Sequence, residues 1–476
     1  MKLRISAVLL LLCMFICTAC GTEENLLRIS MTGDSWIAGF GSTEIAIPET
    51  EDPLYLAGYR GGAEYEGILD LPRASAVWMG TEDDGGILLI GIDCIGLGAD
   101  TVARIRAMLA PFAEESGCAA IAVYATHTHA GMDTLGLWGP TAQDGKNEQY
   151  MDSLLAAAAD AAQRAYDARK SGTLYFSQTA TEGLQTDSRA PYVYDTNLYQ
   201  LRFQPEDGTP GGRIVFFGAH AESLRGDNRL LSRDFPGVMA DTVSAETGET
   251  MLFVPGAIGG LVLTPELYAG DVETVSDFYA ENCRVTGEML ADIALSVTEE
   301  VPLAPSLAYA ETTFSVPLDN TLFLYYKFLG ILGNPITDGA DSETGYALTS
   351  TCAALRLGDT VTAALLPGEV FPELVYTDTE FRMAGAGYQL LDTTFPSLSR
   401  LAEQYGCGTL LICGLANDEL GYILPPESYM VNPDLPYFDG ITDESGENHY
   451  EETMSAGIRT AQNLFAAMET VFAALG

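Results

Sequence analysis

The stretches ILLIGIDC (residues 87–94) and AAIAVYATHTH (residues 119–129) decide the fold of this chain. Each contains an apolar run with the length and composition of a buried strand, Ile87 to Cys94 and Ala119 to Ala125. Between them, Ala99 to Glu115 has the spacing of an amphipathic helix, and Gln149 to Lys170 follows as a second helix. Strands that alternate with helices in this way predict an α/β fold.

The same alternation continues to the end of the chain. The further strand-like runs and helical segments are Arg213 to Ala219, Met251 to Val254, Val275 to Thr298, Val361 to Leu366, Thr409 to Cys413 and Glu452 to Leu475. No linker rich in Pro, Gly or Ser divides the sequence, and no repeat is evident. We therefore expect a mixed sheet covered by helices in a single large domain, residues 20–476. Its ligands should bind outside the carboxyl ends of the strands.

The first residues have the layout of a bacterial signal peptide. Lys2 and Arg4 precede an apolar run, Ile5 to Ile16, that is too short to span a membrane. Small residues stand directly before Cys20, as they do at the processing site of bacterial lipoproteins. We predict that residues 1–19 are a lipoprotein signal peptide, that Cys20 is lipidated, and that the lipid holds the protein at a cell membrane outside the cytoplasm. The alternative is an ordinary secretory signal with Cys20 unmodified.

The composition narrows the range of partners. The formal net charge of −43 at pH 7 excludes a general affinity for nucleic acid, because phosphate backbones need a positive surface. An anionic membrane would not attract this surface either, so contact with lipid would depend on the anchor. The later cysteines are scattered without a CxxC pattern, and we expect most of them to be buried thiols. A bridge between Cys407 and Cys413 is not indicated.

Histidine is scarce, with four residues in all, and three of them follow strand-like runs. The two-residue period of a strand places His127 and His129 on the same side of the chain. Two imidazoles that face one space suit a metal site, or a metal ligand beside an acid–base group. Taken alone, this spacing is explained at least as well by two polar side chains that are satisfied at a strand end.

Two more residues strengthen the interpretation as a metal site. His220 ends the run that begins at Arg213, and Glu369 follows a third apolar run and a Pro-Gly turn. Two nitrogens and one carboxylate oxygen leave a coordination position free for water, as a catalytic zinc requires. Glu369 could instead cap the helix that follows it.

At this point the sequence resembles the neutral/alkaline non-lysosomal ceramidases, over most of the chain that follows the signal. The most specific element is ATHTHAG (residues 125–131), which is similar to the ATHTHSG run of that family. The further matches, in the family's order, are His220 with LSRDFPG (231–237), PGE (367–369), LAN (415–417) with GYI (421–423), PESY (426–429) and YE (450–451). The resemblance implies a zinc-dependent amidohydrolase that cleaves the N-acyl bond of ceramide or a related N-acyl lipid. It also implies a catalytic domain without the additional C-terminal β domain of the fuller enzymes.

The resemblance also implies roles for individual residues. One Zn²⁺ would be held by His127, His220, Glu369 and Tyr422. His129 would transfer the proton, Tyr450 would donate a hydrogen bond to the developing oxyanion, and Arg189 would contact the reacting carbonyl. For each tyrosine the alternative is a core aromatic with a satisfied hydroxyl. We expect His449 to be a surface neighbour of Tyr450.

The chain also departs from the family's pattern. Where the family has NxGDxSP, this sequence has GAIGGLVLTP (residues 256–265), in which Thr264 is the only hydroxyl residue. Metal binding is therefore better supported than specificity for sphingolipids. Two other possibilities stay open: a surface lipoprotein that captures metal, and a protein that keeps the fold and the metal but has lost turnover.

Overall fold

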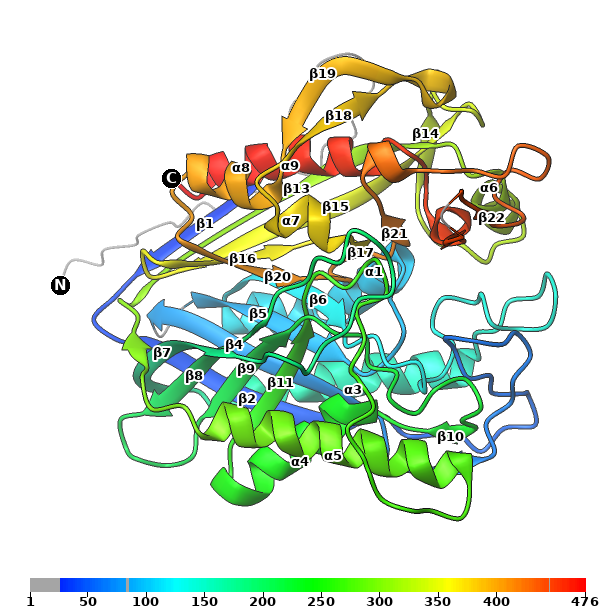
Figure 1. Ribbon diagram of the computed structural model, residues 1–476. Coiled ribbons are helices and arrows are strands. Elements are labelled where there is room, and N and C mark those ends of the chain that lie inside the picture. The colour runs from blue at the N-terminus through cyan, green and yellow to red at the C-terminus, as the bar shows by residue number, and fades with distance from the viewer. Residues whose placement is uncertain (1–25, 83–84, 445) are drawn as a thin grey trace.

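Two mixed β-sheets face each other in a computed structural model, which describes residues 26–82, 85–444 and 446–476 (Figure 1). The predicted signal peptide and Cys20 lie outside the described residues. The larger sheet has nine strands, in the order β11 (Thr250–Pro255), β9 (Gly212–Phe217), β8 (Asn197–Pro205), β7 (Lys170–Ala180), β2 (Trp36–Glu44), β4 (Arg73–Glu82), β5 (Gly85–Ile92) and β6 (Cys118–Ala125), with β12 (Val301–Pro302) paired to β7. Its two outer pairs, β11 with β9 and β5 with β6, are parallel, and its inner pairs are antiparallel.

The second sheet has six strands. They are β1 (Leu27–Thr32), β13 (Ser306–Leu318), β15 (Tyr346–Leu357), β16 (Val361–Leu365) and β20 (Thr409–Cys413) in that order, with β14 (Ile336–Asp338) paired to β15. Strands β16 and β20 are parallel, and the other pairs are antiparallel. Four small two-stranded sheets are formed by β3 (Gly67–Ile68) with β10 (Leu230–Leu231), β17 (Glu369–Val370) with β21 (Tyr422–Ile423), β18 (Glu380–Ala384) with β19 (Leu390–Pro396), and β22 (Ile441–Thr442) with β23 (Asn448–His449).

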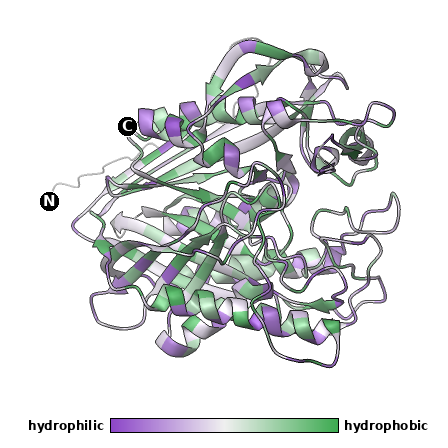
Figure 2. Cartoon of the chain, viewed as in Figure 1, coloured by the Kyte–Doolittle hydropathy of each residue, from purple (hydrophilic) through white to green (hydrophobic). Residues whose placement is uncertain are grey.

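The main core lies between the two large sheets. Strand β5 shows why its sequence is apolar without interruption: Ile87 and Leu89 pack in the core between the sheets, whereas Leu88 and Ile90 pack in a second core on the other face. A strand that is buried on both faces has no solvent side to fill with polar residues. Figure 2 shows the resulting concentration of hydrophobic residues on the central strands.

Helices cover the outer faces of both sheets. They are α1 (Ala99–Met108), α2 (Ala110–Ser116), α3 (Glu148–Asp167), α4 (Asp234–Thr247), α5 (Val275–Leu295), α6 (Thr321–Phe328), α7 (Pro372–Tyr376), α8 (Leu398–Gln404) and α9 (Thr460–Ala474). Helix α3 packs on β2 and β4, α4 packs on β11, and α9 packs on β13 and β15 from the opposite side (Figure 1). The predicted α/β class is confirmed, with helices on one face of each sheet because the other faces bury each other. Among the described residues, no helix is long and apolar enough to cross a membrane.

Two predicted helices differ clearly from the structure, whereas those predicted for Gln149 to Lys170 and Val275 to Thr298 each end three residues early, at Asp167 and Leu295. The segment predicted as one helix from Ala99 to Glu115 is two, α1 and α2, because Pro111 in the first turn of α2 has no backbone N–H to continue the α1 hydrogen bonds. The last helix begins at Thr460 and not near Glu452, because Gly457 has a φ of +156° and interrupts the helical path. The six later cysteines are all free, as expected.

The larger sheet coils strongly, and this decides where its strand ends lie. Strand β11 at one edge contacts β5 and β6 at the other edge. The coiling follows from the right-handed twist that each strand adds to the next. As a result, the carboxyl ends of β6 and β9 meet, although five strands stand between β9 and β6 in the hydrogen-bonded order.

Candidate metal and active site

The two histidines of the THTH segment leave the end of β6 with an unusual backbone. His127 has a φ of +65°, which is a left-handed backbone conformation. This conformation is unfavourable for any residue other than glycine, and it persists only where the surrounding structure imposes it. The Nδ1 atom of His127 lies 2.6 Å from the carbonyl oxygen of Ile95. Because a carbonyl only accepts, Nδ1 carries the proton and Nε2 presents a free lone pair to the space in front of the strand.

The second strand end is joined directly to the first. Thr128 and Ala221 form a parallel bridge, and the backbone N–H of His129 donates to the carbonyl of Ala221 over 3.0 Å. The buried His220 precedes this bridge, and its Nδ1 lies 3.0 Å from the carbonyl oxygen of Val262. Nε2 of His220 therefore also faces the common space.

Glu369 completes the group from the first position of β17, which follows β16 of the second sheet after a short turn. Its Oε2 lies 3.0 Å from Nε2 of His220 and 3.5 Å from Nε2 of His127. Burial alone would raise the pKa of Glu369, but the nearby His127 and His220 outweigh burial and hold this pKa well below the ordinary range. The bond to Glu369 likewise outweighs burial at His220, whose pKa is raised. Glu369 does not cap α7, whose N-cap residue is Phe371.

Tyr422 is placed beside Glu369 by the backbone. The two residues are register partners in the parallel pair of β17 and β21, so their side chains leave the same face. Tyr422 is almost fully buried, and it lines the same cavity as Glu369. Burial first, and then the charge of Glu369, raise the pKa of the Tyr422 hydroxyl well above its ordinary value.

This arrangement fits a divalent cation with nitrogen and oxygen ligands. Two ligand atoms that each lie 2.0–2.1 Å from a tetrahedral zinc are roughly 3.4 Å apart, which agrees with the 3.0 and 3.5 Å found here. One ligand atom from each of His127, His129 and His220 also lies within 4.8 Å of the others. The described residues can therefore hold a metal, and His129 is close enough to either join the ligands or stand beside them.

His129 has its own surroundings, which differ from those of the other two histidines. Its Nε2 lies 3.1 Å from Nε2 of His127. Its Nδ1 lies 3.3 Å from Oε2 of Glu222, and the same oxygen accepts a 2.6 Å hydrogen bond from the hydroxyl of Tyr59. Burial, and then the charges of His127 and His220, hold the pKa of His129 well below its ordinary value, so its imidazole is neutral near pH 7.

Tyr450 and Arg189, the two other predicted catalytic residues, are placed differently. Tyr450 lines the cavity, with its ring edge-on to Tyr422 at 6.2 Å between centroids. Arg189 does not line the cavity; it is buried with its guanidinium 2.9 Å from Glu451 and 3.2 Å from Glu452. Arg189 thus anchors the segment that carries Tyr450, and its contact with a reacting carbonyl stays a prediction.

The expectation that His449 is a surface residue is wrong. Only 6% of His449 is exposed, and its Nδ1 lies 2.7 Å from Nη2 of Arg189 and 3.1 Å from Glu452. The imidazole of His449 is buried because its hydrogen-bonding partners, Arg189 and Glu452, are themselves buried. Thr264 is also buried, and its hydroxyl lies 3.0 Å from that of Ser223, so it does not line the cavity in place of the family's serine.

His127, Glu369 and Tyr422 form part of the wall of a cavity of about 590 Å³, and the buried His220 lies behind it. This volume falls within the range of roughly 300–1,000 Å³ that is usual for small-molecule sites. Its apolar wall is made by Ile95, Leu135, Leu137, Trp138, Leu261, Leu263, Phe323, Tyr326, Leu332 and Met454. Three carboxyl groups lie in the wall, those of Glu222, Glu369 and Glu419, and burial and then the charge of Glu369 raise the pKa of Glu419 well above its ordinary value.

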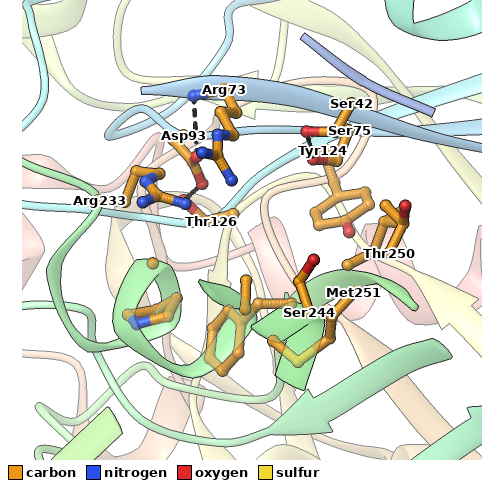
Figure 3. A pocket seen from close by; sticks show the side chains of 16 residues that line it. Ser42, Arg73, Ser75, Asp93, Tyr124, Thr126, Arg233, Ser244, Thr250 and Met251 are labelled. Atoms are coloured by element: carbon orange, nitrogen blue, oxygen red, sulfur yellow. Dashed lines mark hydrogen bonds between the residues drawn. The ribbon is translucent and has the colours of Figure 1, made fainter. Parts of the chain in front are cut away.

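A smaller cavity of about 90 Å³ lies behind the THTH segment (Figure 3). In it the Thr126 hydroxyl donates to Asp93 over 3.1 Å, and the backbone N–H of Arg73 donates to the same carboxylate over 2.9 Å. Burial raises the pKa of Asp93 to about 6, although Arg233 and these hydrogen bonds oppose the shift. The hydrogen bond to Asp93 holds Thr126, the residue that precedes His127, in place. The residues around this smaller cavity therefore have a structural role beside the metal site.

Sequence reasoning missed Glu222, Tyr59 and Glu419. Glu222 follows His220 at the same two-residue spacing that links His127 to His129, so a signal for it was present in the sequence. Tyr59 lies in a glycine-containing loop, GYRGG (residues 58–62), without any periodic signal. Its contact with the site depends on Gly58, which has a φ of +114° and packs directly against the imidazole of His129.

Comparison with known proteins identifies the fold. No protein-family model matches the sequence, and no curated protein matches it. The structure is similar to that of the neutral ceramidase from Pseudomonas aeruginosa, with a TM-score of 0.65 and 15% identity, over 93% of this chain and 74% of that chain. A second solved structure, a ceramidase complexed with C2, has a TM-score of 0.63 and 14% identity over 92% of this chain and 74% of its own. This chain therefore has an α/β fold of the ceramidase type.

Proposed function

We propose that this protein is a zinc-dependent hydrolase that cleaves the amide bond of an N-acyl lipid, with ceramide as the first candidate. The observation that carries the proposal is the convergence of His127, His220 and Glu369 from three separate segments, with His127 and Glu369 on the wall of a largely apolar cavity and His220 buried directly behind them. The fold shared with two ceramidase structures supports it. The four ligands proposed for the zinc are these three residues and Tyr422.

A zinc ion in this position would supply Lewis acidity and lower the pKa of a water molecule. His129 accepts the proton of the attacking water at its free Nε2, which is available because the low pKa keeps the imidazole neutral. The same residue then returns the proton to the amine that leaves. Tyr450 keeps its proton, because burial raises its pKa, and donates a hydrogen bond to the oxyanion.

The cavity supports a lipid amide as the substrate class. Its wall is dominated by Leu, Phe, Tyr and Trp side chains, which suit an alkyl chain. We also propose that the protein is held at the outer face of a membrane through lipid on Cys20, close to such substrates.

The experiment begins with metal analysis of purified protein by mass spectrometry. The same preparation is then assayed for fatty-acid release from ceramides of several chain lengths and from other N-acyl lipids. The matched variants are His127→Ala and His129→Ala. The first should lose zinc and activity together, whereas the second should keep zinc and lose turnover by about 10²–10⁴-fold, the usual contribution of a general base.

Each possible outcome separates the alternatives. Stoichiometric zinc with hydrolysis supports the enzyme, and stoichiometric zinc without hydrolysis of any substrate supports a protein that has lost turnover. Readily exchanged zinc without hydrolysis supports a metal-capturing lipoprotein, in which His129 would complete the ligand set. Full turnover of His129→Ala with bound zinc would remove the role assigned to His129.

A further inference from the structure

We infer that Glu222 is a positioning residue that holds the imidazole of His129 in the orientation and tautomer needed for proton transfer. The inference rests on the proposed function, which gives His129 its task. It adds a residue that neither the sequence motifs nor the metal ligands indicate.

The contact geometry is the first support. Nδ1 of His129 is buried, and among the described residues it makes no hydrogen bond of good geometry. Oε2 of Glu222 lies 3.3 Å from it, at the right distance but with imperfect alignment. Catalytic hydrogen bonds are often long or poorly aligned before the substrate binds. A small rotation of either side chain would satisfy the buried nitrogen.

The contact also sets the tautomer. A carboxylate accepts a hydrogen bond and cannot donate one, so its partner nitrogen must carry the proton. With Nδ1 protonated, Nε2 of a neutral His129 is the free acceptor for the proton of a water molecule. Without Glu222, the polar contact that the described residues leave to the ring is the one of 3.1 Å between its Nε2 and Nε2 of His127, and because that His127 atom is an acceptor, this contact would favour the opposite tautomer.

Glu222 is itself held in place. The two N–H groups that follow it, at Ser223 and Leu224, donate to the buried carboxylate of Asp234 over 2.9 and 3.0 Å. The Tyr59 hydroxyl donates to Oε2 over 2.6 Å, the same oxygen that faces His129. The Tyr59 ring also packs edge-on against the His129 ring, at 5.3 Å between centroids. Glu222 therefore has little freedom to move away from His129.

Kinetics of Glu222→Ala and Glu222→Gln provide the first test. Removing the carboxylate should lower kcat by about 10–100-fold, the usual effect of losing a group that orients an active histidine. KM should change little, and zinc content should stay at the wild-type level. Gln keeps one oxygen, and a single oxygen makes both contacts, so Glu222→Gln should recover most of kcat. Loss of zinc in Glu222→Ala, an unchanged kcat, or an equal loss in both variants would overturn the assignment.

An NMR measurement tests the inference without any substrate. With only four histidines in the sequence, imidazole ¹⁵N signals can be assigned with His129→Ala as the reference. Wild-type protein should show His129 with the proton on Nδ1, and Glu222→Ala should shift the population toward a proton on Nε2. An unchanged tautomer would reject the positioning role even if the protein hydrolyses amides. If the tautomer shifts but no N-acyl substrate is cleaved, the proposed function fails while the positioning contact stands.

Discussion

Replacing Gly58 by alanine should lower turnover because the added methyl group would collide with the side chain of His129. A Cβ at position 58 would lie 2.7 Å from the Cβ of His129, against about 3.4 Å for an ordinary close contact. The added Cβ would also lie 2.8 Å from Cγ and from Nδ1 of His129, so the imidazole must move by about 0.7 Å to reach ordinary contact distances. A misplacement of about 1 Å in a catalytic group costs roughly 10²-fold, so we expect kcat to fall by about 10–100-fold.

Gly62→Ala is the matched control, because it lies in the same loop with a φ of +71° but its Cβ would meet only Pro140 at 3.9 Å. Both variants should lose about 1–2 kcal/mol of unfolding free energy to the left-handed backbone, and Gly58→Ala about 1–3 kcal/mol more from overpacking. Urea unfolding measures the stability, fatty-acid release measures kcat, and mass spectrometry measures zinc. Equal kcat values for the two variants would refute the packing argument.

Three further predictions concern charge and metal. Glu369→Gln should weaken zinc binding by at least about 10–100-fold, the cost of losing even an indirect metal contact, whereas the exposed Glu273→Gln should bind zinc normally in the same titration. Chelation of the metal should lower the melting temperature and abolish hydrolysis, and added Zn²⁺ should restore both, since a ligand of the native state alone stabilises it; a chelated protein that keeps its activity would contradict the site. Burial raises the pKa of Asp418 from 3.8 to about 6, so the folded state binds the proton more tightly and loses stability as pH rises from about 4 through 6. This loss of unfolding free energy should reach up to about 3 kcal/mol in the wild-type protein and be absent in Asp418→Asn. Urea unfolding of both proteins at pH 4 and pH 7 measures it, and the same change with pH in both proteins would contradict the prediction.

The α/β class could be predicted from the sequence because a strand that is buried on both faces has an uninterrupted apolar run, which is visible in the sequence. The run from Ile87 to Cys94 is apolar at each position except Asp93. Strand β5, which contains most of this run, packs against a core on each face. The positions of His127, His220 and Glu369 after strand-like runs were also visible, because a strand and the residue that follows it are neighbours in sequence. The break at Pro111 was also visible in the sequence, because proline lacks the N–H that the helix needs, whereas the start of the last helix depends on the backbone conformation at Gly457.

The neighbours of the site could not be predicted in the same way. Arg189 matched a family arginine, yet its guanidinium is engaged by Glu451 and Glu452. Such pairings depend on side chains that are more than 250 residues apart in sequence, as the hydrogen bond between Arg189 and Glu452 shows. No periodic pattern encodes a contact of this kind, because each partner only needs to be polar at its own position.

The sequence by itself determined that strands end in histidines and a carboxylate, because hydrophobic periodicity is a local property of the chain. Only the tertiary structure decided that these ends meet. The twist that accumulates over the larger sheet brings the ends of β6 and β9 together, and the segment that follows β16 of the second sheet adds Glu369. The same long-range packing decided which residue faces His129, since Glu222 and Tyr59 reach it from segments that the sequence does not link.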